Sequence, residues 1–490
     1  MRSRFVLVLC LTCLSCLAAP EPGVRVAPRV LGYQFDISRC KVPTMATLRE
    51  RLGILAKLGY GQVQFYTEHT FAYRDHETVW RDASPLTAAE VRELDDFCAA
   101  RGIELVPNQN SFGHLEQWLR HPGYNDLAEV PHGGTEIRQW HKTMERPTTL
   151  CPTDPRSLQL ITGLYDELLP CFRSKYLNVG CDETMELLNW TPEANRSAEA
   201  LAEKGPAEVY VEFLRRIHEA VTSRGHVMMF WGDIVLRHPE KLGDLPKEGV
   251  VALNWGYEAN HPFDRESARL AQAGLSFYEC PGTSAWGSLF GRVSNMMTNV
   301  ACAFAAAERH GAEGVLLADW GDGGNPQPWL VSLPSIVYAA ACAQGRALTR
   351  EGLAAEIDAV TGGRCGEALL DIGDIYRVCG GRTGNRTELY YLLEDGVAYV
   401  PANGVTGDSV TAALKAYRVA RAKVSLAGAK AWAREDFELL DLLAEAVALR
   451  AENPRMVNFR AVFEPRYRAL WLRQNRVGGL ESSLTQVFGR

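Results

Sequence analysis

Two neighbouring carboxylates, Asp182 and Glu183, end the segment Leu-Asn-Val-Gly-Cys-Asp-Glu. Adjacent carboxylates repel each other, and burying either one is costly. Acids in such unfavourable positions gather at functional sites. Cleavage of a glycosidic bond requires a proton donor for the leaving oxygen and a group that stabilises a cationic anomeric carbon, and two carboxyl groups can supply both. The pair is therefore a candidate catalytic centre.

Aromatic and acidic residues stand at the ends of several other apolar segments. A sugar ring has apolar faces and an edge of hydroxyl groups, so aromatic walls and carboxylate acceptors suit a hexose-binding site. We expect the walls to be Trp231, Trp255, Trp286, Trp320 and Tyr278, and the hydroxyl acceptors to be Glu68, Asp319 and Asp322.

These residues follow short apolar runs that alternate with amphipathic, helix-like runs. One such helix is predicted at 87–102, with Thr87 and Glu90 forming a capping box and Gly102 ending it. The alternation predicts a (β/α)8 barrel, a TIM barrel, because no Gly-x-Gly-x-x-Gly motif supports the alternative of a doubly wound open sheet. The eight predicted strands are 30–36, 62–68, 103–109, 176–183, 227–233, 250–256, 275–280 and 314–322.

The barrel is expected over 30–345. Since the carboxyl ends of its strands meet on one face, the polar strand ends should form one site there rather than lie in the core. From 346 to 490 the strand pattern stops and apolar residues recur at helical spacing, for example at Phe437, Leu440 and Ala444. We therefore expect a helical C-terminal region that packs against the barrel.

The first 19 residues have the pattern of a signal peptide. Arg2 and Arg4 precede an apolar run from Phe5 to Ala19 that is too short for a comfortable membrane span. We expect cleavage near Ala18 or Ala19 and export to the periplasm or outside the cell, with a retained N-terminal anchor as the alternative. No later segment is long and apolar enough to predict a membrane span.

Charge and cysteine spacing argue against other classes of protein. The net charge is −7 and basic residues do not cluster, so no nucleic-acid partner is expected. Of thirteen cysteines, Cys10, Cys13 and Cys16 lie in the signal-like segment, and the other ten lack CxxC spacing. Neither a metal site nor another cofactor is predicted, and a metal-dependent barrel hydrolase is disfavoured because His114 stands alone among the strand ends.

The motif Asn-Val-Gly-Cys-Asp-Glu is similar to the His-x-Gly-Gly-Asp-Glu signature of glycoside hydrolase family 20, the β-N-acetylhexosaminidases. It most resembles the hexosaminidase D-like branch, in which Gly-Cys-Asp-Glu replaces Gly-Gly-Asp-Glu. The resemblance extends over most of the barrel, since YTEHTF, PNQNSFGH, FWGD, NWGY and ADWGD occur in the family's order. It is weaker in the helical C-terminal region.

The resemblance implies a substrate-assisted, retaining mechanism on a carbohydrate that carries N-acetylhexosamine. Glu183 would be the general acid and base, and Asp182 would hold the acetamide N–H. By motif position, the substrate-binding residues would be Trp231 and Trp255 as acetamide-pocket walls, Tyr278 as donor to the acetamide oxygen, Trp320 as stacking platform, Asp322 as hydroxyl acceptor, and Glu68 and His114 as supporting residues. Tyr257 is the alternative to Tyr278. Exo-cleavage of terminal β-linked N-acetylglucosamine or N-acetylgalactosamine is expected.

Two positions depart from the family pattern, because Asn178 replaces the motif histidine and Leu31 stands where many members have an arginine. A non-catalytic sugar-binding protein on the same barrel is the alternative function, although the intact acid pair disfavours it. Three glycosylation sequons, at Asn189, Asn195 and Asn385, are interpreted as chance matches. The preferred sugar, the aglycone and the oligomeric state cannot be inferred from these patterns.

Overall fold

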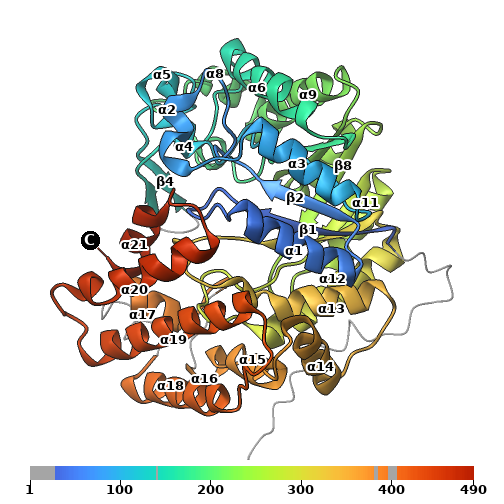
Figure 1. Cartoon of the computed structure of the whole chain (residues 1–490). Helices are drawn as coiled ribbons and strands as arrows, with labels where there is room; N and C mark the ends of the chain where they lie inside the picture. Colours follow the sequence, from blue (N-terminus) through green and yellow to red (C-terminus); the bar gives the residue numbers. More distant parts are fainter. Residues whose placement is uncertain (1–27, 139–141, 380–383, 396–404, 490) are drawn as a thin grey trace, which may run out of the picture.

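A computed structural model describes residues 28–138, 142–379, 384–395 and 405–489. The signal-like segment, residues 1–19, lies outside the described residues. The predicted fold class is confirmed: eight parallel strands form a barrel, helices surround it, and a helical region follows (Figure 1). The barrel strands are β1 (Val30–Asp36), β2 (Gln62–Tyr66), β3 (Glu104–Val106), β6 (Tyr176–Asn178), β7 (Val227–Trp231), β8 (Val250–Trp255), β9 (Ser276–Cys280) and β10 (Gly314–Asp319).

Hydrogen bonding runs through the strand order β3-β2-β1-β10-β9-β8-β7-β6. The two ends of this order meet, because Asn108 and Asn178 form a parallel bridge and the Asn178 N–H donates to the Pro107 carbonyl at 2.9 Å. The sheet thus closes on itself. A small antiparallel hairpin, β4 (Thr135–Ile137) with β5 (Lys142–Met144), lies in the connection between β3 and β6.

The barrel strands are followed by α1 (Met45–Leu58), α3 (Ala88–Ala99), α6 (Pro155–Leu168), α9 (Pro206–Thr222), α10 (Asp233–Arg237), α11 (Phe263–Gln272), α12 (Val293–His310) and α13 (Leu333–Ala343). Shorter helices in the loops are α2 (Glu77–Trp80), α4 (Glu116–Leu119), α5 (Pro122–Asn125), α7 (Met185–Leu188) and α8 (Ala198–Lys204). The predicted capping box is present, since the Glu90 N–H donates to Thr87 Oγ1 and the Thr87 N–H donates to Glu90 Oε2.

The C-terminal region is helical, as predicted, and its helices lie against one side of the barrel (Figure 1). They are α14 (Arg350–Thr361), α15 (Gly366–Ile372), α16 (Tyr376–Cys379), α17 (Glu388–Asp395), α18 (Gly407–Ala422), α19 (Ala431–Glu452), α20 (Phe459–Gln474) and α21 (Leu480–Phe488). The predicted apolar stripe of α19 is buried at Phe437, Leu440, Ala444 and Val447.

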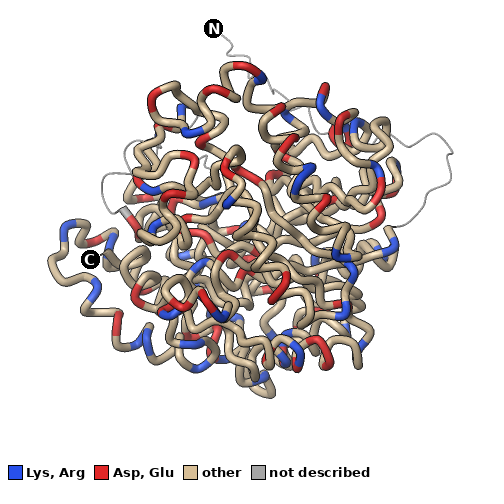
Figure 2. Tube along the Cα trace, turned by 90° about the horizontal axis from the view of Figure 1, so that it is seen from above, with Lys and Arg blue, Asp and Glu red and all other residues tan. Residues whose placement is uncertain are grey.

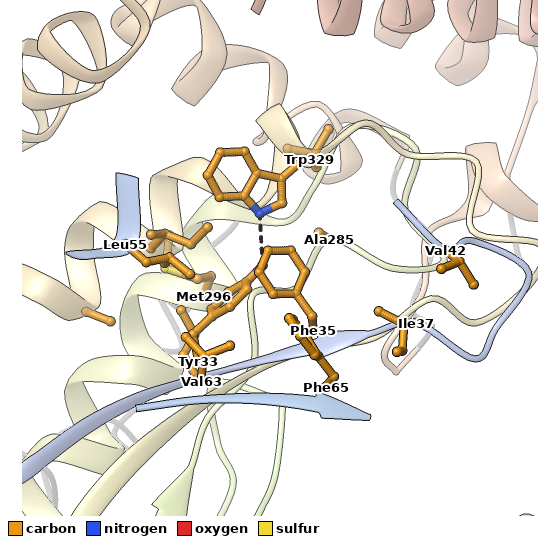
Figure 3. Packing of buried hydrophobic residues seen from close by; sticks show 14 of the residues in the cluster. Tyr33, Phe35, Ile37, Val42, Leu55, Val63, Phe65, Ala285, Met296 and Trp329 are labelled. Carbon is orange, nitrogen blue, oxygen red and sulfur yellow. Dashed lines mark hydrogen bonds between the residues drawn. The ribbon is translucent and has the colours of Figure 1, made fainter. Parts of the chain in front are cut away.

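Between β1 and the layer of helices lies a cluster of aromatic and aliphatic side chains (Figure 3). Tyr33 and Phe35 point outward from β1 and pack against Trp329, whose indole N–H donates to the Tyr33 hydroxyl at 3.0 Å. Trp329 also contacts Trp432 of α19 edge to face. This packing joins the barrel to the C-terminal region through one continuous core.

A polar cavity, which we call the interface cavity, lies beside this packing and is lined by Lys41, Arg51, Asp436 and Gln474 among others. The Lys41 ammonium donates to the Gln327 carbonyl at 2.9 Å, and the Arg51 guanidinium donates to Gln474 Oε1 at 2.9 Å. Asp436 accepts from the Leu330 N–H at 2.9 Å and from Gln474 Nε2 at 2.8 Å. Burial raises the pKa of Asp436 to about 6 and lowers that of Lys41 to about 7.

Positive and negative residues are interspersed along the chain in Figure 2. The ten cysteines within the described ranges are free thiols. In that part of the chain, no helix is long and apolar enough to cross a bilayer.

Candidate active site

The loop after β6 that carries the acid pair has an unusual backbone. Gly180, Cys181 and Glu183 have φ values of 68°, 71° and 47°, in the left-handed region. At Gly180 a side chain is excluded, because a Cβ would lie 2.4 Å from Asn110 Oδ1. A non-glycine residue in this conformation costs on the order of 1–3 kcal/mol and persists only where its surroundings hold it. The loop is therefore held by tertiary contacts.

Two side chains, Asn178 and Tyr210, hold the loop by hydrogen bonds to its backbone. Asn178 accepts from the Gly180 N–H at 3.0 Å and donates to Gln64 Oε1, inside the barrel, at 2.8 Å. The buried Tyr210 hydroxyl of α9 donates to the Cys181 carbonyl at 2.9 Å. The departure from the family motif at Asn178 thus has a structural role, because this amide joins the acid loop to a polar layer of the barrel interior.

His114 lies against both acids. Its Nε2 is 3.2 Å from Asp182 Oδ2 and 3.4 Å from Glu183 Oε2. The approach requires Gly113, since a Cβ there would lie 2.1 Å from the Asp182 carbonyl oxygen. Burial opposes the charged imidazolium, but the Asp182 carboxylate and the contact with Glu183 outweigh it and hold the pKa of His114 well above its ordinary value. A cation between the two carboxylates offsets their repulsion.

A third carboxyl group, Asp233 at the start of α10, lies behind the pair. The Glu183 N–H donates to Asp233 Oδ2 at 3.4 Å. Loss of hydration, followed by the charges of Asp182 and Glu183, raises the pKa of Asp233 to about 8. Asp233 is the last residue of the predicted strand 227–233, but no role was predicted for it, because its closeness to the acids depends on the neighbouring positions of β6 and β7.

The acid pair faces a pocket at the carboxyl ends of the strands. Trp255 stacks on Tyr257 with ring centroids 5.2 Å apart, and Trp286 meets Tyr257 edge to face at 4.9 Å. The ring centroids of Trp231 and Trp320, which also line the pocket, are 5.7 Å apart. The residues that line the pocket are Arg39, His114, Asp182, Glu183, Trp231, Trp255, Tyr257, Trp286, Trp320, Asp322 and Asn385.

Tyr278 does not reach this pocket, and the expectation that it lines the mouth is wrong. The strands are staggered, so Tyr278 pairs with Gly314, the first residue of β10. Its ring covers Gly314, where a Cβ would lie 2.7 Å away, and the side chain is 1% exposed inside the barrel. Tyr257, the alternative, lines the pocket instead. Its hydroxyl oxygen accepts from the Trp320 indole N–H at 2.8 Å, so its own proton can be donated to a ligand.

Arg39, which the sequence analysis missed, supplies a cation to the pocket. Its guanidinium is 3.2 Å from Asp322 Oδ1 and 3.1 Å from Asp36 Oδ2, and it lies 4.8 Å above the rings of Tyr66 and Trp320. The family pattern places its arginine at the position of Leu31, at the opposite end of β1. A signal was available, because Arg39 lies three positions after Asp36 and the loop after β1 also opens at the mouth.

Two predicted hydroxyl acceptors are engaged within the protein. Glu68 accepts from the Tyr66 hydroxyl at 2.9 Å and lies 3.8 Å from Arg39, behind the pocket wall rather than in it. Burial raises the pKa of Glu68. Asp319 accepts from the hydroxyls of Tyr33, Thr283 and Ser332 and lines the interface cavity, so it is turned away from the pocket. Asp322 is the predicted acceptor that lines the pocket.

Several polar atoms in the pocket wall are buried and have no hydrogen-bond partner among the described residues. They include Asp182 Oδ1, Trp231 Nε1, Trp255 Nε1 and Asn385 Oδ1. Buried polar groups are normally paired, so an unpaired set around one cavity is what a polar ligand would satisfy. Within the described ranges, no group of three or more His, Cys, Asp or Glu side chains is placed to hold a metal ion.

Comparison with known proteins agrees with this geometry. Residues 66–286 match the family model for the catalytic domain of glycosyl hydrolase family 20. The matched segment runs from the end of β2 to the loop after β9, so most of the barrel resembles that catalytic domain. Among curated relatives, the chain is 24% identical to human hexosaminidase D over 225 residues, 44% of this chain and 43% of the relative. It is 26% identical to the bovine protein of that name over 146 residues, 30% of this chain and 38% of the relative. The matches thus span less than half of either relative.

Solved structures show the same fold at low identity. A family 20 exo-β-N-acetylglucosaminidase from Vibrio harveyi superposes with a TM-score of 0.54 at 16% identity, over 70% of this chain and 58% of that one. A chitobiase from Flavobacterium johnsoniae gives a TM-score of 0.53 at 14% identity, over 93% of this chain and 78% of that one. These likenesses support the barrel architecture.

Proposed function

We propose that this protein is an exo-acting β-N-acetylhexosaminidase that removes terminal β-linked N-acetylglucosamine or N-acetylgalactosamine. The observation that carries the proposal is the pair Asp182–Glu183, bridged by His114, in a pocket walled by tryptophans. The match of residues 66–286 to the model of the family 20 catalytic domain supports it. Carbohydrate is the expected partner because the pocket combines aromatic faces with Arg39 and Asp322, which suit ring hydroxyls.

In the proposed mechanism the substrate supplies its own nucleophile. The 2-acetamido oxygen attacks the anomeric carbon as the bond to the glycosidic oxygen breaks, and Glu183 protonates the departing oxygen. The resulting oxazolinium is positively charged, and the Asp182 carboxylate stabilises it while accepting from the acetamide N–H. Glu183 then removes a proton from water, whose oxygen attacks the same carbon as the bond from that carbon to the acetamido oxygen breaks, which restores the 2-acetamido group and the original configuration.

The remaining pocket residues have matching roles in this proposal. Tyr257 donates its free hydroxyl proton to the acetamide oxygen, with Trp231 and Trp255 enclosing the acetamide methyl group. Trp320 provides the surface under the sugar ring. His114 orients the two acids and offsets their mutual repulsion, so that neither has to leave the pocket wall.

The test compares matched aryl β-glycosides that carry either a 2-acetamido or a 2-hydroxyl group. We expect kcat/KM to be far higher for the acetamido substrate, because the protein contributes no nucleophilic carboxylate of its own. We also expect a thiazoline analogue of the cyclised intermediate to bind more tightly than the parent sugar, and Asp182→Asn to weaken that preference. A ratio near one, or a covalent sugar trapped on a carboxylate, would contradict the mechanism. Sugar binding without hydrolysis of any acetamido substrate would favour the alternative, a non-catalytic sugar-binding protein.

We further propose that the protein is exported and loses residues 1–19. The basis is the charged and apolar pattern of that segment. N-terminal sequencing of the native protein should return a start near Ala19 or Pro20, and a start at Met1 would contradict cleavage.

A further inference from the structure

One residue of the pocket comes from outside the barrel. Asn385 lies in the segment 384–387, between α16 and α17 of the C-terminal region, yet it lines the same pocket as Glu183 and Trp320. Its Oδ1 is buried and, among the described residues, has no hydrogen-bond partner. The sequence analysis interpreted Asn385 as part of a chance sequon.

The backbone of Asn385 is held by an ion pair. Its N–H donates to Glu258 Oε1 at 2.6 Å, and Glu258 is in turn bound by both terminal nitrogens of Arg292, at 2.9 Å and 3.0 Å. The side chain of Arg292 is only 3% exposed, and a two-pronged contact of this kind fixes orientation as well as distance. Because Glu258 follows Tyr257 directly, the same short stretch positions both Tyr257 and Asn385.

A second anchor ties the segment to the loop that carries Trp286. The Thr387 N–H donates to the Gly287 carbonyl at 2.9 Å, and Thr387 Oγ1 donates to the Ser288 carbonyl at 3.0 Å. The contact is close enough that a Cβ on Gly287 would lie 2.7 Å from Arg386 Cγ. Asn385 is thus fixed from two sides, by the loops after β8 and β9.

The conformation of Asn385 also favours its residue type. Its φ is 58°, in the left-handed region that asparagine adopts more readily than most residues. Asparagine adds an uncharged acceptor oxygen and two N–H donors. The pocket already holds charged groups in Arg39 and Asp322, so an amide extends its hydrogen-bonding capacity without changing its net charge.

We propose that Asn385 is a substrate-contact residue, supplied by the C-terminal region, whose side-chain amide forms a hydrogen bond with a hydroxyl group of the bound aminosugar. The inference rests on the proposed function and adds a specificity determinant to it. It also means that the barrel does not form the complete sugar pocket by itself in this protein.

The experiment pairs a variant with modified substrates. kcat/KM is measured for the wild type and Asn385→Ala on an aryl N-acetyl-β-hexosaminide, the glucosaminide or the galactosaminide, whichever the wild type cleaves faster, and on its 3-, 4- and 6-deoxy analogues. A hydrogen bond of about 1–1.5 kcal/mol corresponds to a loss of ~5- to 12-fold for the variant on the parent substrate. We expect one deoxy analogue to lose this factor in the wild type and to be insensitive to the substitution, as coupling between the two groups requires.

The matched control is Asn475→Ala. Asn475 is another asparagine of the C-terminal region with a buried Oδ1 that lacks a partner in the described part of the chain, but it lines the interface cavity. We expect its kcat/KM values to follow the wild type on all four substrates.

An equal loss for Asn385→Ala on the parent and all three deoxy analogues would overturn the inference and indicate a structural role. If the wild type cleaves none of the substrates, the proposed function fails separately. Calorimetric binding of N-acetylglucosamine then decides the inference: weaker binding by Asn385→Ala supports the contact, whereas equal affinity, or no binding to the wild type, overturns it.

Discussion

The pocket that contains the acid pair and the interface cavity are lined by similar residue types, but their charged groups are paired to different extents. Both combine carboxylates, a basic residue and tryptophan rings near the end of β1. In the interface cavity each charged group that we describe has a protein partner, as Lys41 has Gln327 and Asp436 has Leu330 and Gln474. These paired charges stabilise the contact between barrel and helices, and the buried atoms of the cavity lining that lack a partner among the described residues are neutral amide oxygens, those of Gln327 and Asn475.

In the pocket, by contrast, a carboxylate oxygen and indole N–H groups are left unpaired. Asp182 Oδ1 and Trp255 Nε1 are buried and unpaired within the described residues, and the backbone is left-handed at Cys181 and Glu183. Unpaired polar atoms and local strain lower stability, and proteins retain them where a ligand or a reaction requires them. The two sites therefore differ in which groups lack a partner: a carboxylate oxygen and indole N–H groups in the pocket, and neutral amide oxygens in the interface cavity.

The largest effect that separates the two sites should come from Glu183→Gln. Without a proton donor, we expect kcat on substrates with poor leaving groups to fall by ~10²–10⁴-fold while the fold is kept. The matched control is Glu435→Gln, which neutralises a carboxylate of the interface cavity and should leave kcat within about twofold. Near-normal turnover of a natural disaccharide by Glu183→Gln would contradict the assignment.

For Asp436→Ala, in contrast to Glu183→Gln, we expect a loss of stability with little change in kcat. Removing the Asp436 carboxylate leaves the buried Leu330 N–H without an acceptor and takes one of the two acceptors of the Gln474 amide, the other being Glu435 Oε2, so it should lower the free energy of unfolding by about 3 kcal/mol. Chemical denaturation measures this loss, and kcat of the folded fraction should change little. A loss of kcat without a loss of stability would show that the cavity acts in the reaction.

A smaller effect should distinguish Tyr257 from Tyr278. Tyr257→Phe removes the proposed donor to the acetamide oxygen and should reduce kcat/KM by ~5- to 150-fold, as for a buried hydrogen bond of about 1–3 kcal/mol. Tyr278→Phe, inside the barrel, should leave kcat/KM unchanged. Steady-state kinetics on an aryl N-acetyl-β-hexosaminide gives both values. Equal losses of kcat/KM in the two variants would contradict the assignment of the acetamide donor to Tyr257.

The smallest effect concerns the pH dependence of stability. Because the pKa of Asp233 is raised to about 8 by loss of hydration and by Asp182 and Glu183, the folded state binds this proton more tightly than the unfolded state. Its stabilising contribution is full below about pH 4, the ordinary range of an aspartate, and is lost as the pH rises through about 8. The positive charge of Arg237 opposes this rise in the pKa of Asp233.

Asp233→Asn should therefore make the fall in Tm between about pH 4 and about pH 8 smaller by a few degrees. Scanning calorimetry at fixed ionic strength measures this difference. The control is Glu435→Gln, which removes a carboxylate of the interface cavity instead and should keep the wild-type slope. An unchanged slope in Asp233→Asn would mean that Asp233 is ionised throughout.

The eight strands could be predicted because buried parallel strands are short apolar runs, and here each ends in polar residues. The acid pair and the tryptophans were found for the same reason. The depth of a side chain could not be predicted, as Tyr278 demonstrates, because it depends on the stagger between strands rather than on position within one strand. The position of Asn385 in the pocket could not be predicted, since it depends on how a distant segment of the chain packs onto the loops after β8 and β9.

The contacts between α19 and the loop after β10 have a consequence for how this protein melts. Asp436 accepts from Leu330, and Trp432 packs on Trp329, in the same loop that begins with the Trp320 platform. Separating the helices from the barrel would expose this aromatic core and leave buried charges unpaired, so neither part can open alone at low cost. Barrel and helices should consequently unfold in a single calorimetric transition, and a chain cut near residue 345 should not yield an independently folding barrel.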